Sequence, residues 1–118
     1  MINQVILVGR LTADPEKQEL KSDKTKVRFT LAVNRPYKDE QGNSVADFIP
    51  VVCWNGTAEN VLKYCTKGFL VGVEGSLHAR KYETESGAKR TTYEVSANRV
   101  VFLERKKDVK EEDEDPFA

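Results

Sequence analysis

Apolar residues in this 118-residue chain come in short runs separated by polar, turn-forming stretches, a pattern typical of strands. The first run (residues 2–9) is apolar and β-branched throughout, which predicts a strand covered on both faces. Residues 27–34 instead alternate apolar and polar positions, so they predict a strand with one core face. In all, strands are predicted at residues 2–9, 27–34, 47–54, 69–83 and 89–103, with room for one short strand within residues 16–26.

A single helix is predicted over residues 57–66, with Asn55 or Thr57 as its cap and Gly68 just past its end. Its apolar stripe consists of Val61, Leu62 and Cys65. In the strand before it, Pro50 cannot donate a ladder hydrogen bond, so that strand is expected to lie locally at an edge or a bulge. The order of three strands, one helix and two strands predicts an all-β OB-fold, a five-stranded Greek-key barrel with the helix between strands 3 and 4.

Charge divides the chain into two parts. Residues 111–118 carry five acids and no base, which leaves 19 basic and 14 acidic residues, a net charge of +5, in residues 1–110. We expect a folded domain over residues 1–104 and a short disordered acidic tail over residues 105–118. Neither a membrane-spanning run nor a secretory signal is present, so a cytoplasmic, nucleoid-associated location is expected. The spacing of Cys53 and Cys65 fits no metal site, and reduced, packed thiols are expected.

Four aromatic residues in or beside predicted strands have basic residues close by: Tyr37, Phe48, Trp54 and Tyr82. A ring offers a flat π-face to an unstacked base, and a nearby cation meets the phosphate beside that base. Single-stranded nucleic acid is the ligand that needs both. Taken one at a time, such rings more often fill a β core. The strongest candidates are Phe48 and Trp54, because their even spacing places them on one strand face beside Pro50.

Most of the 19 Lys and Arg residues are expected to be solvated surface. The candidate phosphate contacts are those that neighbour the rings or lie in barrel loops: Arg35, Lys38, Lys67, Arg80, Lys81, Lys89 and Arg90. Weaker candidates are Arg10 and Arg28. The sequence has no phosphate-binding loop, nucleophile motif or metal-binding spacing, and His78 is best explained as a strand-surface residue. We therefore expect a binding protein without enzymatic activity, cofactor or metal.

Several segments, in order and without large gaps, resemble bacterial and phage single-stranded DNA-binding proteins. The resemblance covers roughly residues 1–103 and is carried by residues 2–16, 46–49, 51–54, 58–61, 67–68, 72–75, 80–82 and 91–95. The pattern is most similar to that of low-GC Gram-positive bacteria and their phages. In this family the base-stacking positions match Tyr37, Phe48, Trp54 and Tyr82.

The resemblance implies an OB-fold that assembles as a homotetramer and binds single-stranded DNA in replication, recombination and repair. It also implies that the acidic tail docks replication and repair proteins, through Asp113, Glu114, Asp115, Pro116 and Phe117. In the family the terminal carboxylate of the Phe takes part in docking, and here Ala118 displaces that carboxylate. Two alternatives remain open on the residues: an RNA-binding or primosomal OB-fold module, and a scaffold whose barrel is inert and whose tail binds partners.

Overall fold

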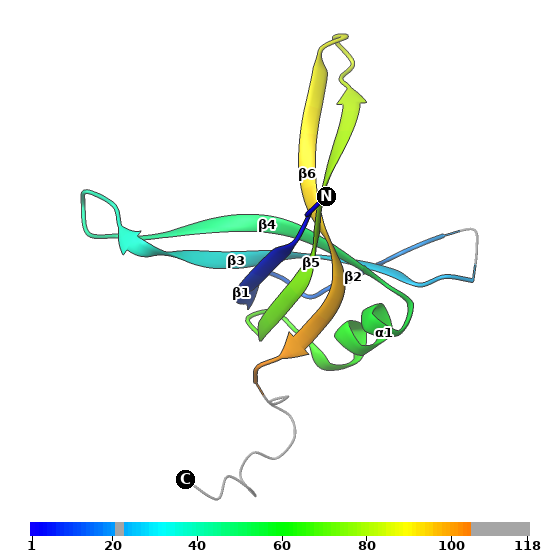
Figure 1. The fold of residues 1–118 in the computed structure, drawn as a ribbon, viewed down its shortest axis with the longest axis horizontal. Coiled ribbons are helices and arrows are strands. Elements are labelled where there is room, and N and C mark those ends of the chain that lie inside the picture. The colour runs from blue at the N-terminus through cyan, green and yellow to red at the C-terminus, as the bar shows by residue number, and fades with distance from the viewer. Residues whose placement is uncertain (21–22, 105–118) are drawn as a thin grey trace, which may run out of the picture.

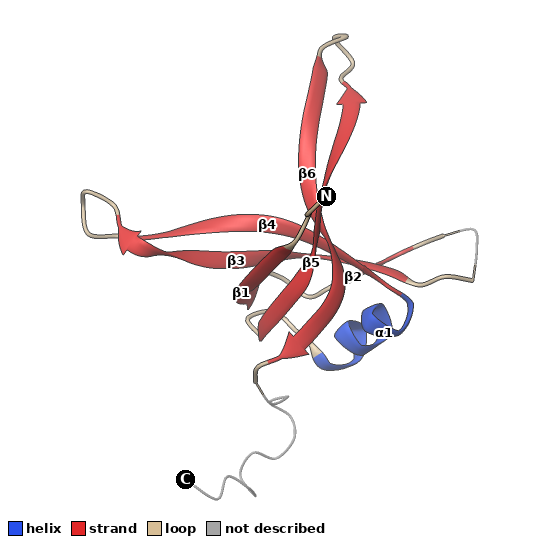
Figure 2. Ribbon diagram, in the orientation of Figure 1, coloured by secondary structure: helices blue, strands red, loops and turns tan. Residues whose placement is uncertain are grey.

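The computed structural model describes residues 1–20 and 23–104. Within them the chain forms six strands and one helix, joined by loops. The elements in chain order are β1 (Val5–Leu11), β2 (Glu16–Gln18), β3 (Lys26–Lys38), β4 (Ser44–Trp54), α1 (Asn55–Tyr64), β5 (Leu70–Glu83) and β6 (Lys89–Phe102). Figure 2 shows how strongly strand dominates this fold. The predicted fold class is therefore confirmed as all-β.

The strands form one closed barrel. Their order is β1-β5-β6-β4-β3-β2, and β1 also pairs with β3, which joins the two ends of the five long strands. All pairings are antiparallel except that of β4 with β6, which is parallel. The short β2 extends the sheet beyond β3 and takes no part in closure. This is the five-stranded OB-fold predicted from the order of elements, with α1 between the third and fourth barrel strands.

Strand alternation places the core inside the barrel. Val27, Phe29 and Leu31 of β3 are buried and contact the apolar side chains of the other barrel strands. The helix covers one end of this core, because its Ala58 and Val61 are fully buried and it packs against β3, β4 and β6. Phe69 is also buried.

Two free thiols lie in the core, as expected from their spacing. Burial raises the pKa of Cys53 to about 12 and that of Cys65 to about 11. Both residues are therefore neutral thiols at physiological pH and behave as small apolar groups.

The helix begins two residues earlier than predicted, at Asn55, and the predicted side-chain cap is wrong. Trp54 occupies the cap position with extended backbone angles, and no side chain caps the helix. The side chain of Asn55 is engaged elsewhere: its Oδ1 accepts from the Thr25 N–H at 3.4 Å, while its own N–H donates to the Thr25 carbonyl at 2.8 Å. Asn55 has φ of +52°, a left-handed conformation that Asn tolerates better than most residues. This bend carries the chain from β4 directly into α1.

The first strand is shorter than predicted, and only one of its two faces is buried. It begins at Val5 rather than at residue 2. Val5 and Leu7 face the core, but Ile6 and Val8 on the other face are 64% and 54% exposed. In addition, β1 pairs with β3 only at Arg10 and Leu11, so most of that edge has no strand beside it. The second apolar face of β1 is thus left uncovered by the rest of residues 1–20 and 23–104.

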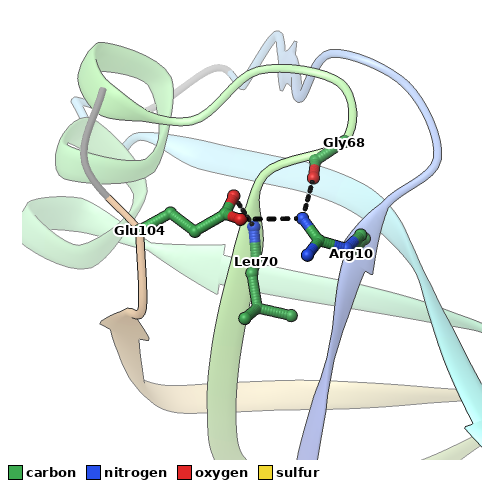
Figure 3. A network of polar contacts seen from close by, with 4 residues as sticks. All are labelled: Arg10, Gly68, Leu70 and Glu104. Atoms are coloured by element: carbon green, nitrogen blue, oxygen red, sulfur yellow. Dashed lines mark hydrogen bonds and ion pairs between the residues drawn. The ribbon is translucent and has the colours of Figure 1, made fainter. Parts of the chain in front are cut away.

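A polar network holds the end of the described chain against the barrel (Figure 3). Glu104 accepts a hydrogen bond from the Leu70 N–H at 3.0 Å and from Arg10 Nη1 at 2.9 Å. The same Nη1 donates to the Gly68 carbonyl at 2.9 Å. Arg10, a weak candidate for DNA contact on sequence grounds, is therefore engaged in joining β1, the start of β5 and the second residue after β6.

Two long hairpins leave the barrel in different directions (Figure 1). One is formed by β3 and β4, and the other by β5 and β6. These hairpins and the outer face of β4 carry most of the predicted site residues.

Candidate nucleic-acid interface

Phe48 and Trp54 both project from the outer face of β4, 66% and 37% exposed. Two residues lie between them on that face, Pro50 and the buried Val52, so the rings flank a covered stretch of strand. β4 pairs with β6 only at Val51 and Val52, which leaves Phe48 and Pro50 in a segment that pairs with β3 alone. The local edge predicted from Pro50 is confirmed. It leaves Phe48 in the more open part of the strand.

A lysine that no sequence motif indicates lies against Trp54. Lys26 of β3 is directly opposite Trp54, and its Nζ is 5.2 Å from the centroid of the indole ring. This distance is within the range of a cation–π interaction, worth about 0.5–1 kcal/mol at an exposed site. Lys26 is 28 positions away in sequence, and only the β3–β4 register brings it here.

Two arginines and one glutamate form a cluster over the covered stretch of β4. Arg28 lies opposite Val52, and its Nη1 donates to Glu94 Oε1 at 3.3 Å. Arg80 Nη2 donates to the other oxygen of Glu94 at 3.4 Å. The Glu94 side chain is 12% exposed, whereas both arginines reach solvent. The cluster thus joins β3, β5 and β6 and presents two guanidinium groups beside the β4 rings.

The β5–β6 hairpin carries a second ring-and-cation arrangement. Tyr82 is directly opposite Arg90, and directly opposed residues of an antiparallel pair share a face. A hollow of about 460 Å³ lies along this part of the hairpin, lined by Lys81, Tyr82, Glu83, Lys89, Arg90 and Thr91. Five of the predicted residues (Arg80, Lys81, Tyr82, Lys89 and Arg90) are therefore brought together on one hairpin.

Tyr37 belongs to a third group, near the end of β3. Arg35 forms a bidentate ion pair with Asp47, with Nε to Oδ2 at 2.8 Å and Nη2 to Oδ1 at 2.7 Å. Its Nη1 also donates to Tyr37 Oη at 2.9 Å. Asp47 alternates with Phe48 along β4, so this group lies on the opposite face of the hairpin from Phe48. A nucleic-acid strand that contacted both rings would have to pass around the edge of the hairpin.

The remaining predicted cations are more scattered. Lys38 ends β3, close in sequence to Tyr37. Lys67 precedes β5, at the opposite end of that strand from Arg80 and Tyr82, and the structure does not bring it to the hairpin group. Its N–H donates to Asp14 Oδ1 at 2.8 Å. The tail residues (Asp113, Glu114, Asp115, Pro116 and Phe117) lie outside the described residues.

Within residues 1–20 and 23–104, no group of acidic, His or Cys side chains is arranged to hold a metal ion. His78 contacts Ser76 Oγ through Nε2 at 2.9 Å on the strand surface. The described helix is too short and too polar to cross a membrane. The outer surface carries exposed rings with guanidinium groups near them.

A small OB-fold barrel with exposed rings beside cations defines a class of binding proteins that present one face to an oligomeric ligand. The chain belongs to the single-strand binding protein family, whose model matches residues 2–103. This finding confirms the resemblance read from the sequence motifs. The matching family is one of binding proteins and not of enzymes.

Curated relatives in Gram-positive bacteria are similar over most of the chain. A "Single-stranded DNA-binding protein" of Halalkalibacterium halodurans is 47% identical over 104 residues, which cover 88% of this chain and 62% of the relative. "Single-stranded DNA-binding protein 3" of Listeria innocua and "Single-stranded DNA-binding protein 1" of Staphylococcus aureus are each 47% identical over 106 residues. Those matches cover 90% of this chain and 66% and 68% of the relatives. The chain thus spans about two thirds of the length of these relatives.

Proposed function

We propose that this protein binds single-stranded DNA with little sequence preference, by stacking bases on exposed rings and pairing phosphates with lysines and arginines. The observation that carries the proposal is the outer face of β4, where Phe48 and Trp54 are exposed beside Lys26 and Arg28. Every base has a π-face and every nucleotide a phosphate, so these contacts read no sequence. The names of the relatives agree with this choice of ligand.

The four rings have the same role in this proposal but different settings. Phe48 and Trp54 form the central platform on β4, Tyr82 extends it along the β5–β6 hairpin, and Tyr37 lies on the β3–β4 hairpin. Phosphate contacts are assigned to the cations near these rings: Lys38, Arg80, Lys81, Lys89 and Arg90. To these we add Lys26, which the structure places over Trp54, and Arg28, a weaker candidate on sequence grounds. Lys67 remains a candidate at the far end of β5.

We also propose that the protein assembles as a homotetramer. Ile6 and Val8 expose an apolar face on β1, and the edge of β1 opposite β5 has no paired strand from Val5 to Val8 within the described chain. Unpaired strand edges and exposed apolar side chains favour pairing with another chain. A second copy would cover both features, and the family resemblance supplies the number of subunits.

A role in DNA replication, recombination and repair, in the cytoplasm, completes the proposal. In that setting, tail residues 113–117 would recruit replication and repair proteins, with acidic side chains and one aromatic ring as the docking groups. Because the tail and the barrel surface have opposite charge, we expect the tail to contact the basic surface when no DNA is bound and to compete with DNA for it.

Fluorescence titration with oligo(dT) of increasing length tests the proposed function. Trp54 is the chain's only tryptophan, so its emission should fall as a base stacks on it. Repeating the titration at several salt concentrations should give a negative slope of log affinity against log salt, with roughly 0.7 for each phosphate contact. Unchanged fluorescence at saturation, or tight binding that is insensitive to salt, would contradict the stacking or the electrostatic part of the proposal.

The same titration with an RNA oligomer of matched sequence separates the proposal from an RNA-binding or primosomal module. The rings and cations on this surface are not specific for the 2′-hydroxyl, which is the group that distinguishes RNA from DNA. Binding of DNA at least as tight as that of RNA is expected, and tighter binding of RNA would favour the alternative.

A further inference from the structure

Arg35 is held on two sides by its own protein. Both oxygens of Asp47 accept hydrogen bonds from its guanidinium, and Tyr37 Oη accepts a third. These bonds use three of the five N–H donors of an arginine, one on each nitrogen. Arg35 and Asp47 lie on different strands of the hairpin, and the side chains of both are less than half exposed.

Both members of the ion pair stay charged near neutral pH. The hydrogen bonds from Arg35 lower the pKa of the Asp47 carboxyl below its ordinary value. The hydrogen bond to Asp47 likewise raises the pKa of the Arg35 guanidinium, with a smaller contribution from Tyr37. A phosphate that approached Arg35 would therefore meet a pair whose charges already cancel.

Tyr37 is 56% exposed and lies within the irregular part of the β3–β4 register, between Asn34 and Lys38. An exposed tyrosine without a partner would rotate, and binding would have to fix its orientation at an entropic cost. The hydrogen bond from Arg35 restricts the phenol end of this side chain while leaving much of the ring accessible.

We propose that Arg35 is a positioning residue, which is anchored by Asp47 and holds the Tyr37 ring ready to stack on a base, and that it makes no phosphate contact of its own. The proposal rests on the proposed function, because it assumes that Tyr37 stacks on single-stranded DNA. It replaces the sequence-based role of Arg35 as a phosphate contact.

Affinity for fluorescein-labelled oligo(dT), measured by polarisation over a range of salt, tests the proposal. Arg35→Ala should weaken binding about two- to tenfold, the cost of one side chain that binding must now immobilise. The slope of log affinity against log salt should stay at its wild-type value. As a matched control, Lys38→Ala on the same strand should reduce the slope by roughly 0.7, the value for one phosphate contact.

Three further variants separate positioning from charge. Tyr37→Phe keeps the ring but loses the phenol oxygen, so it should weaken binding as much as Arg35→Ala. The double variant should bind no more weakly than either single variant, because both remove the same hydrogen bond. Arg35→Lys retains the charge but not the fork that bonds to both partners, so it should resemble Arg35→Ala.

A reduced salt slope in Arg35→Ala, wild-type affinity in Arg35→Lys or Tyr37→Phe, or additive losses in the double variant would each overturn the positioning role. Thermal unfolding of every variant checks that the fold is intact. If the wild-type protein binds oligo(dT) and one of these contrary results is obtained, only the role of Arg35 fails. If the wild-type protein does not bind oligo(dT) at all, the proposed function fails and this role fails with it.

Discussion

Phe48 and Trp54 point to the same side of β4 and are six positions apart, roughly 20 Å along an extended strand. Between them Val52 is buried, and opposite Val52 stands Arg28, which is paired with Glu94. The two rings are thus held apart by a rigid strand with a guanidinium between them. This spacing suits a flexible polymer that alternates flat bases with charged phosphates.

Replacement of either β4 ring by alanine should weaken binding of single-stranded DNA. The expected loss is about 1–3 kcal/mol for each base that no longer stacks. Polarisation of labelled oligo(dT) measures it without relying on tryptophan emission. Phe48→Trp should retain affinity because it keeps a π-face, whereas Phe48→Leu, which keeps only the apolar bulk, should resemble Phe48→Ala. Full affinity in Phe48→Leu would show that Phe48 does not stack.

We expect the exposed face of β1 to be buried in an interface with another copy of the chain. Light scattering at micromolar concentration should give the mass of four chains for the wild-type protein. Ile6→Asp or Val8→Asp would place a carboxylate in this interface, where it would have to be desolvated. Either variant should therefore give a mass below that of four chains. Ser44→Asp, at an exposed position of the β3–β4 hairpin, is the control and should leave the mass unchanged. A monomeric wild-type protein would refute the assembly.

Removal of residues 111–118 should leave DNA binding intact or strengthen it at low salt. The five acids of this segment compete with phosphate for the basic surface, and salt screens that competition. A variant that ends at Lys110 should therefore bind at least as tightly as the whole chain, and the difference should shrink as salt rises. It should also lose any partner that docks through Pro116 and Phe117. Binding several-fold weaker than that of the whole chain would place residues 111–118 in the DNA-binding surface.

Gly9→Ala should destabilise the barrel where β1 meets β3. A Cβ atom at this position would collide with the backbone carbonyl oxygen of Ala32, so one of the two strands would have to move. Such overpacking costs about 1–3 kcal/mol in the free energy of unfolding. Gly56→Ala is the control, since a Cβ there meets open space and the residue is helical. Thermal unfolding should show a lower midpoint for Gly9→Ala alone, and equal midpoints for the two variants would contradict the close approach.

Much of the fold could be predicted because it depends on local periodicity. Alternation in residues 27–34 correctly predicted which side of β3 faces the core, and the order of strands and helix predicted the OB-fold. The errors lie at element ends, such as the start of α1. There Asn55 bonds to Thr25, a residue 30 positions away that no local pattern could identify.

The candidate site was only partly predictable. Ring-and-cation pairs adjacent in sequence, such as Arg80, Lys81 and Tyr82, could be selected by inspection. The cation over Trp54 could not be predicted in this way. If the register of the Lys38–Ser44 pair continued without a shift along the hairpin, Gly56 would lie opposite Lys26. The irregularity in β3 shifts the register by two residues, and Trp54 takes that place instead.

By itself, the sequence determined the elements, their order and the chemistry available on the surface, since side-chain alternation follows from covalent geometry. Only the tertiary structure decided which cations are available to a ligand and which are already engaged. Arg10, Arg28 and Arg35 look alike in the sequence, yet each has a different acidic partner. Those pairings depend on barrel closure and cross-strand register, which arise from contacts between residues far apart in the chain.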